Sequence, residues 1–140
     1  MATTMHLDVV SAENSLFSGD ILELFAPGEM GDLGIMPKHT QLITTLKAGE
    51  LRYITEEGEA SLFVAGGVME VQPSVVTVLA DTAVRAEDLD AEAAEAAQQR
   101  AEDALKGKDP EDLDYEAIKT ELQAAQAQIE MIHRIGKTLR

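Results

Sequence analysis

In the first part of the chain, hydrophobic and polar residues alternate one by one. In the last part, hydrophobic residues recur every three or four positions, as in a helix, and the change lies near Arg85. Met5, Leu7 and Val9 alternate with polar neighbours, which predicts a half-buried strand. The same reasoning predicts further strands at residues 20–26, 41–46, 51–55, 61–65, 68–72 and 75–80. Pro27-Gly28 and Gly66-Gly67 are among the turn signals between them. Short strands at this spacing indicate an antiparallel sandwich or a flattened barrel.

Beyond Arg85, nothing interrupts a helix before Gly107 and Pro110. We therefore expect one helix from about 90 to 106 and a second from about 115 to 137. The polar link between them is short enough to reverse the chain direction. The C-terminal part is thus predicted to be an antiparallel helical hairpin.

Two stripes are expected to form the contact between these helices. Helix two offers a stripe of mainly large apolar residues: Ile118, Leu122, Ala125, Ile129, Ile132 and Gly136. The facing stripe on helix one consists mostly of alanines: Leu89, Ala93, Ala96, Ala97, Ala101 and Ala104. Because alanine buries little surface, at about 25 cal/mol per Å² this contact is expected to be weak.

Composition excludes several classes of ligand. The 140 residues carry a formal net charge of -15, with a pI near 4.4, which disfavours nucleic acid and anionic lipid as direct partners. No cysteine is present, so disulfides and thiolate chemistry are absent. Neither a signal peptide nor a run of about 20 apolar residues is recognisable, so membrane association is expected only through a partner.

Gly28, Gly31 and Gly34 lie three apart, which is not the spacing of a dinucleotide-binding fingerprint. Glu29 and Asp32 between them would also repel a phosphate. Two interpretations stay open for this segment. It is either a glycine-rich turn that needs positive φ angles or an exposed loop that docks a protein partner.

Candidate catalytic and metal sites are weak. His6, His39 and His133 have no carboxylate or serine at a spacing typical of a triad or a ligand set, so we expect structural or surface roles. The acidic run 109–116 lacks the glycine and the distal glutamate of a calcium loop, and is expected to cap a helix. The sequence therefore predicts no catalytic residue, cofactor or metal ligand.

Three cations, Arg134, Lys137 and Arg140, end an otherwise acidic chain. One interpretation is that they offset the dipole at the C-terminal end of a helix. The other is that they form a cationic tip that reaches an acidic partner surface.

Three segments carry a family resemblance: HLDVVSAENSLFSGD, GDLGIMPKH and GGVMEVQPSVVTVLADTAVRAEDLD. They resemble the epsilon subunit of bacterial F-type ATP synthases, in the same order and at matching separations. The resemblance implies a ten-stranded antiparallel β-sandwich at 1–86, followed by an antiparallel two-helix hairpin at 87–140.

The resemblance also implies a role. Epsilon subunits are similar in forming part of the central stalk of the rotor, where the β domain binds the gamma subunit and the c-ring. Their helical hairpin can restrain ATP hydrolysis. We hypothesise that in this chain helix two extends toward the alpha and beta subunits of the catalytic head and engages an acidic segment of a beta subunit. We accordingly expect a non-catalytic subunit, peripheral on the cytoplasmic face of the bacterial inner membrane.

Candidate partner-binding residues come from matching positions in the β domain and, in the hairpin, from the hypothesis of a cationic tip. The segment 28–39 is the expected c-ring contact, the region 66–70 is the expected gamma contact, and the C-terminal cations are expected to reach the catalytic head. The predicted residues are Gly31, Asp32, Leu33, Gly34, His39, Gly66, Gly67, Glu70, Arg134, Lys137 and Arg140.

Two departures from the family pattern matter. Many nucleotide-sensing relatives carry Leu-Asp-x-x-Arg-Ala at the start of helix one, whereas this chain has Ala93 in place of the arginine and the acidic Glu92 beside it. We therefore predict no tight ATP site. Relatives also usually have Pro-Gly-His-Ala-Pro where residues 37–41 read Pro-Lys-His-Thr-Gln.

Two other classes of function remain as alternatives. The first is a free-standing binding module whose helical hairpin mediates self-association. The second is an enzyme, which is disfavoured because the sequence offers no convergent acid, base and nucleophile.

Overall fold

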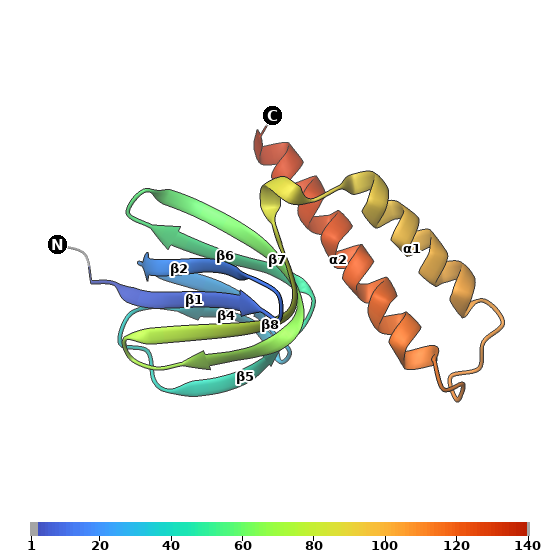
Figure 1. Ribbon diagram of the computed structural model, residues 1–140, viewed down its shortest axis with the longest axis horizontal. Helices are drawn as coiled ribbons and strands as arrows, with labels where there is room; N and C mark the ends of the chain where they lie inside the picture. Colours follow the sequence, from blue (N-terminus) through green and yellow to red (C-terminus); the bar gives the residue numbers. More distant parts are fainter. Residues whose placement is uncertain (1–2, 140) are drawn as a thin grey trace. The chain divides into compact units, whose positions relative to one another are not determined.

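The structure, a computed structural model, describes residues 3–139, with side chains as far as Gly136 (Figure 1). The chain divides into two compact units between Asp88 and Leu89. The first is built of β-strands and the second of two helices.

Within the described residues, eight strands form the first unit, rather than the ten that the family resemblance implies. Their bounds are β1 Met5–Ser11, β2 Ser15–Ile21, β3 Glu23–Gly28, β4 Gly31–Ile35, β5 Leu42–Leu46, β6 Gly49–Thr55, β7 Gly58–Val71 and β8 Val75–Arg85. The count is lower partly because β7 is one continuous strand of 14 residues where two short strands were predicted.

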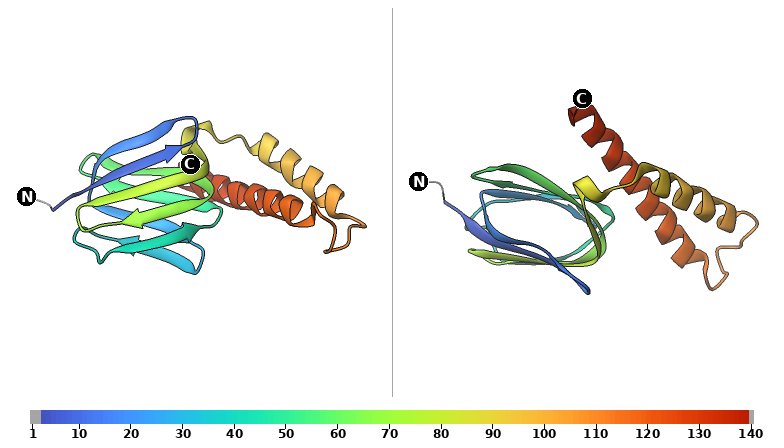
Figure 2. Two further views of the ribbon diagram at one scale, coloured as in Figure 1. Left: turned by 60° about the horizontal axis from the view of Figure 1, so that its bottom comes forward. Right: turned by 45° about the horizontal axis from the view of Figure 1, so that its top comes forward.

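The core lies between two layers of strands, which face each other in the right-hand view of Figure 2. Along β1, buried Met5, Leu7 and Val9 alternate with partly exposed residues, as the sequence pattern predicts. The other strands contribute inward-facing residues in the same way. The core includes Ile21, Leu24, Ile35, Leu46, Leu51, Tyr53, Leu62, Val64, Met69, Val71, Val76 and Val78.

Strand pairing follows the order β2-β1-β8-β7-β5-β3-β4, with β6 paired to β3 and β7. The prediction of a wholly antiparallel sandwich is wrong at one place, because β1 and β8 pair in parallel, with Leu7 opposite Val76 and Val9 opposite Val78. These strands come from opposite ends of the unit, so no tight turn forces them to run in opposite directions.

The predicted turn at Gly66-Gly67 is wrong, since both glycines lie inside β7. Their φ angles are 80° and 130°, and Gly66 is left out of the pairing with β8, while Ala65–Thr82 and Gly67–Ala80 on either side keep one register. The two glycines therefore form an irregularity at which the long strand bends. Its first half pairs with β6 and its second half with β5, so β7 belongs to both layers.

The predicted strand at 20–26 is divided at Leu22, between the end of β2 and the start of β3. The glycine-rich segment that follows is a β-hairpin, β3 and β4, joined by a turn at Glu29 and Met30. Only Gly31 among its three glycines has a positive φ, 138°. The expectation of a glycine-rich turn is therefore right for one residue, and most of the segment is strand.

The second unit begins after a short 3-10 helix, η1 Ala86–Asp88. Helix α1 spans Ala91–Leu105 and helix α2 spans Tyr115–Leu139, close to the predicted bounds, and the two helices are in contact. The Asp90 side chain caps α1 by accepting hydrogen bonds from the backbone N–H groups of Glu92 and Ala93.

The register of α1 differs from the predicted stripe. Ala94 and Ala101 are buried, whereas Ala93, Ala96 and Ala104 are exposed. The predicted stripe begins at Leu89, which precedes α1 and therefore does not share the periodicity of the helix. On α2, Ala125 is buried and Ile118, Leu122, Ile129 and Ile132 are half-buried, in agreement with the predicted stripe, but Met131, which is 1 % exposed, lies outside that stripe.

Candidate partner-binding surfaces

The tip of the β3–β4 hairpin is firmly supported and fully exposed. The Glu29 backbone N–H donates to the Thr45 carbonyl at 3.0 Å, and the Thr45 hydroxyl donates to the Glu29 carboxylate. These bonds attach the turn to β5. Met30 beside it is 97 % exposed, and Asp32 is also exposed.

The four predicted residues of this hairpin lie together on β4. Gly31, Asp32 and Gly34 are exposed, and Leu33 is partly buried against the core. Gly34 pairs with Phe25 of β3, whose ring would lie 3.6 Å from a Cβ at this position. The structure therefore brings these predicted residues together on one short strand.

His39, the other predicted residue of this segment, lies in the loop between β4 and β5. Its Nδ1 is 2.7 Å from the carbonyl oxygen of Thr40. Lys38 before it has a φ of 69° and donates its backbone N–H to the Pro73 carbonyl at 2.9 Å. Lys38 thus has the left-handed conformation that favours glycine.

A second surface is formed by the outer side of β1, β8, β7 and β5. Register places Val10 opposite Leu79, and Leu79 opposite Val68. Leu79 is 55 % exposed, Val68 39 % and Ile43 of β5 69 %. We call the residues Val10, Ile43, Val68 and Leu79 the outer-face patch.

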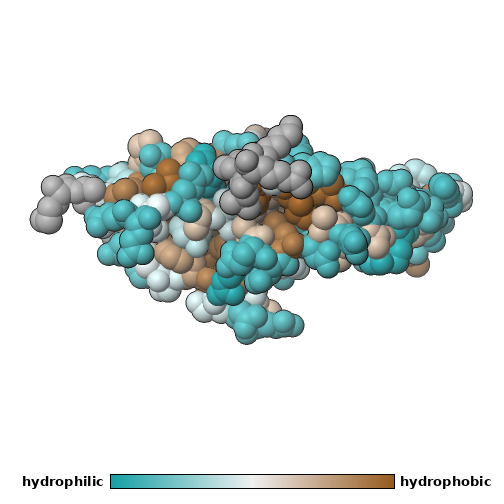
Figure 3. Space-filling model, turned by 90° about the horizontal axis from the view of Figure 1, so that it is seen from above, coloured by the Kyte–Doolittle hydropathy of each residue, from teal (hydrophilic) through white to brown (hydrophobic). Residues whose placement is uncertain are grey.

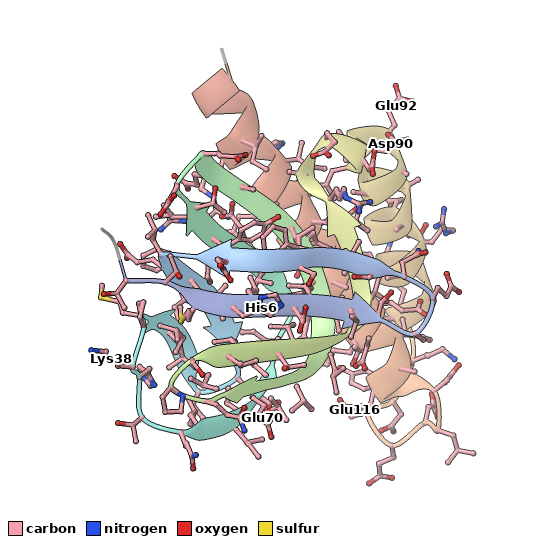
Figure 4. All side chains as sticks on the ribbon, turned by 60° about the vertical axis from the view of Figure 1, so that its left-hand side comes forward. His6, Lys38, Glu70, Asp90, Glu92 and Glu116 are labelled. Atoms are coloured by element: carbon pink, nitrogen blue, oxygen red, sulfur yellow. The ribbon has the colours of Figure 1, made fainter. Side chains whose placement is uncertain are left out.

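Carboxylates accompany the outer-face patch. Asp8 lies opposite Thr77, and Thr77 lies opposite Glu70, which in turn is opposite Ile43. The predicted residue Glu70 is exposed and points from the same layer as His6 in Figure 4. Gly66 and Gly67 precede Glu70 on β7, where they form the bend of this strand.

A polar cluster on β1 and β2 completes this outer face. His6 Nε2 lies 3.1 Å from Asp8 Oδ1, and His6 Nδ1 lies 3.4 Å from Asp20 Oδ1. The hydrogen bonds to Asp8 and then to Asp20 raise the pKa of His6 above its usual value. The hydroxyl of Ser18 donates to Asp8 at 2.6 Å, and this bond lowers the pKa of the Asp8 carboxyl.

No triad-like spacing around His6 is visible in the sequence, yet the structure brings Asp8, Asp20 and Ser18 to its ring, at the surface that the sequence predicts for it. Alternation along a strand places residues i and i+2 on one face, so His6 and Asp8 could have been paired from the sequence. Asp20 and Ser18 could not, because their approach depends on the register of β1 with β2.

Ser18, His6 and Asp20 contact one another in the sequence serine–histidine–carboxylate, as in a hydrolase triad. Ser18 Oγ lies 3.3 Å from His6 Nε2. The serine proton, however, is directed at Asp8 over the shorter distance of 2.6 Å. Histidine therefore does not accept the proton that a nucleophilic serine must lose. The group is an exposed ion-pair cluster on a sheet surface.

The remaining predicted contact residues belong to the C-terminal part of the sequence. Arg134 is exposed near its C-terminal end. The side chain of Lys137 and the whole of Arg140 lie outside the described residues. The surface of the helical hairpin is largely hydrophilic around its connecting loop, as Figure 3 shows.

The start of α1 is occupied by its own cap. Asp90 Oδ1 lies 3.0 Å from the N–H of Glu92 and 3.2 Å from that of Ala93. The carboxylates of Asp90 and Glu92 therefore stand where a phosphate would have to approach the helix (Figure 4).

Two properties of the described residues bear on other functions. No group of three or more His, Cys, Asp or Glu side chains among them is placed to hold a metal ion. Among the helices of residues 3–139, none combines the length and apolar character that crossing a membrane requires.

Comparison with known proteins decides the family. Residues 4–86 match the β-sandwich domain of the delta/epsilon chain of ATP synthase, and residues 87–133 match its long α-helix domain. The chain belongs to the ATP synthase epsilon-chain family. It is 57% identical to the epsilon chain of Nitrosococcus oceani over 140 residues, which cover 99% of both chains. Identity to the epsilon chain of Hydrogenovibrio crunogenus is 53%, covering 99% of this chain and 96% of the relative.

Solved structures show the same fold at low identity. A chain of the Euglena gracilis mitochondrial ATP synthase matches with a TM-score of 0.71 and 18% identity, covering 98% of this chain and 82% of that one. A chain from the central stalk and c-ring of the Tetrahymena thermophila enzyme matches with a TM-score of 0.60 and 13% identity, covering 95% and 96%.

The resemblance noted in the sequence is thereby confirmed. As an epsilon chain, the protein is a non-catalytic, central-stalk subunit of the F-type ATP synthase. The alternatives of a free-standing adaptor and of an enzyme are set aside by identity that extends over the whole chain.

Proposed function

We propose that the β-sandwich of this chain links the gamma subunit to the c-ring, and that the outer-face patch is its contact with gamma. The patch supports this because three large apolar side chains are exposed on neighbouring strands of a rigid layer. Large apolar residues that cluster at the surface mark sites of protein association. Asp8 and Glu70 at the patch favour a partner surface that carries cations.

The β3–β4 hairpin is the proposed contact with the c-ring. A turn that is attached to β5 at Glu29 presents Met30 and Asp32 without the loss of conformational freedom that a mobile loop would suffer on binding. Two contacts on one packed sandwich can transmit torque, because close-packed interiors resist deformation. Through these partners the chain is held at the cytoplasmic face of the bacterial inner membrane.

The helical hairpin is the proposed regulator of ATP hydrolysis. The buried residues of its helices, among those that the structure describes, are Ala94, Ala101, Ala125 and Met131, so only one of them is large, and few kcal/mol separate the packed hairpin from an opened one. In the opened form, the C-terminal end of the hairpin with Arg134, Lys137 and Arg140 extends toward the alpha and beta subunits and engages an acidic segment of a beta subunit. That contact blocks rotation in the direction of hydrolysis.

Substitution within the outer-face patch tests the gamma contact. Leu79→Glu, measured by affinity for purified gamma, is expected to weaken binding about 10-fold or more, equivalent to about 1.4 kcal/mol, because a charge would be buried at the contact. Leu113→Glu is the matched control, since Leu113 is fully exposed in the link between the helices and lies outside the patch. Equal affinity of Leu79→Glu and the unmodified chain would contradict the proposal.

A further inference from the structure

The ion-pair cluster of His6 lies at an edge of the sandwich. Strand β2 is the last strand in the order of pairing, and β1 is its neighbour in the sheet. His6 and Asp8 stand on β1, while Asp20 and Ser18 stand on β2, directly opposite them. Figure 4 shows His6 on the outer side of β1. The side chains of the cluster therefore link the edge strand β2 to its neighbour β1.

The geometry favours a doubly protonated ring. Both nitrogens of His6 face carboxylate oxygens, at 3.1 Å on Asp8 and 3.4 Å on Asp20. A neutral imidazole has one N–H, so it can donate to only one of these acceptors. The other nitrogen would then turn its lone pair toward a carboxylate. Only the imidazolium satisfies both contacts at once.

We propose that His6 is a proton-controlled clasp, which holds edge strand β2 to β1 when its ring is charged and releases one of its two carboxylates when the ring is neutral. Ser18 keeps Asp8 in place through its own hydrogen bond of 2.6 Å. The contact to Asp20, the longer of the two and the one that crosses to β2, is the contact that is lost.

The direction of the pH effect follows from the proton balance. A raised pKa in the folded chain means that the folded state binds the proton more tightly than the unfolded state. This stabilisation is complete below the ordinary value of 6.5 and disappears as the pH rises through the higher pKa of the folded chain. The clasp is therefore closed in mildly acidic solution and open in alkaline solution.

The surroundings leave the two aspartates as the dominant partners. Strand β8, on the other side of β1, faces His6 with Val75 and faces Asp8 with Thr77, neither of which titrates. The next carboxylate on this face is Glu70 of β7, beyond Thr77. Loss of the proton adds one negative charge to a face that already carries Asp8, Asp20 and Glu70.

The test uses the full chain and imidazole NMR between about pH 5 and about pH 9, where histidine titrates. We expect the titration midpoint of His6 to fall in Asp20→Asn and in Asp8→Asn, because each variant removes one charged acceptor. Glu70→Gln is the matched control, since it removes a carboxylate from the same face without touching the ring. Midpoints that are equal in Asp20→Asn and the unmodified chain would overturn the proposal.

Amide exchange tests the consequence for β2. The protection of the β1–β2 ladder, divided by that of the β7–β8 ladder, is expected to decrease as the pH rises through the His6 midpoint. His6→Gln should abolish this decrease, and an unchanged β7–β8 ladder shows that the variant is folded. The same pH dependence in His6→Gln and the unmodified chain would contradict the clasp.

Discussion

Gly67 is a residue whose environment admits no side chain. Its φ of 130° lies outside the range that L side chains adopt readily, and a Cβ would lie against the Leu79 carbonyl oxygen and 2.8 Å from Ala80 Cα. Both neighbours are backbone atoms of β8, so neither can rotate away. The bend that joins the two layers through β7 therefore depends on glycine at this position.

We expect Gly67→Ala to destabilise the sandwich by more than the roughly 1–3 kcal/mol that a disfavoured φ costs on its own, because the clash with β8 adds to it. Gly58→Ala is the matched control, since Gly58 has a φ of 140° but no atom within 4 Å of a Cβ. Denaturant unfolding of both variants measures the difference. Similar losses in the two variants would show that the approach of β8 is unimportant.

Lys38 is the reverse case, a side chain where the backbone favours glycine. Its φ is 69°, in the left-handed region. We expect Lys38→Gly to raise the free energy of unfolding by up to about 1 kcal/mol, since relief of strain exceeds the entropy that glycine adds to the unfolded chain. Lys38→Ala, which keeps a Cβ, should give no such gain. Thermal unfolding that ranks alanine above glycine would contradict this explanation.

At the scale of single residues, sequence patterns predicted which side chains face the core but not which residues are constrained by neighbouring backbone. Inward-facing Met5, Leu7 and Val9 were predicted correctly, because alternation alone fixes which side of a strand is apolar. The strain at Lys38 and the confinement of Gly67 could not be predicted, since both depend on backbone atoms that approach from other segments.

At the scale of elements, the helices were predicted more accurately than the strands. The bounds of α1 and α2 follow from the capping residue Asp90 and from helix-breaking Gly107 and Pro110, all of which are local signals. Strand division was less accurate, because a short irregularity at Leu22 ends one strand and a pair of glycines does not end β7.

The cap of α1 leads to a prediction at this scale. We expect Asp90→Ala to destabilise the helical hairpin by about 1 kcal/mol, since the N–H groups of Glu92 and Ala93 lose their acceptor. Glu92→Ala is the matched control, because it removes a carboxylate from the same end of the helix without removing the cap. Helicity during thermal unfolding, followed by circular dichroism, measures both. Equal effects would assign the stabilisation to charge alone.

At the scale of the whole molecule, the two units differ in how much they bury. The sandwich encloses many large apolar side chains such as Leu24, Ile35 and Met69 between its layers, whereas the buried residues in the described part of the two helices are three alanines and Met131. Cohesion scales with the apolar area removed from water. The sandwich is accordingly suited to a fixed structural role, and the helical hairpin to changes of conformation.

Deletion of residues 114–140 tests the regulatory role in the assembled enzyme. We expect ATP hydrolysis to rise several-fold while assembly with gamma and the c-ring is retained, because the sandwich that makes those contacts is intact. Arg134→Gln combined with Lys137→Gln and Arg140→Gln should reproduce part of the increase, since it keeps the helix and removes its cations. Unchanged hydrolysis in the deletion variant would refute the proposed inhibition.

The sequence by itself determined the change from strands to helices near Arg85, the inward face of most strands and the family, because these depend on local periodicity and on ordered blocks of residues. Only the tertiary structure decided the parallel pairing of β1 with β8, the sharing of β7 between layers and the meeting of His6 with Asp20. The physical reason is that pairing and register bring together residues distant along the chain, and local patterns constrain which side a residue faces but not what it meets there.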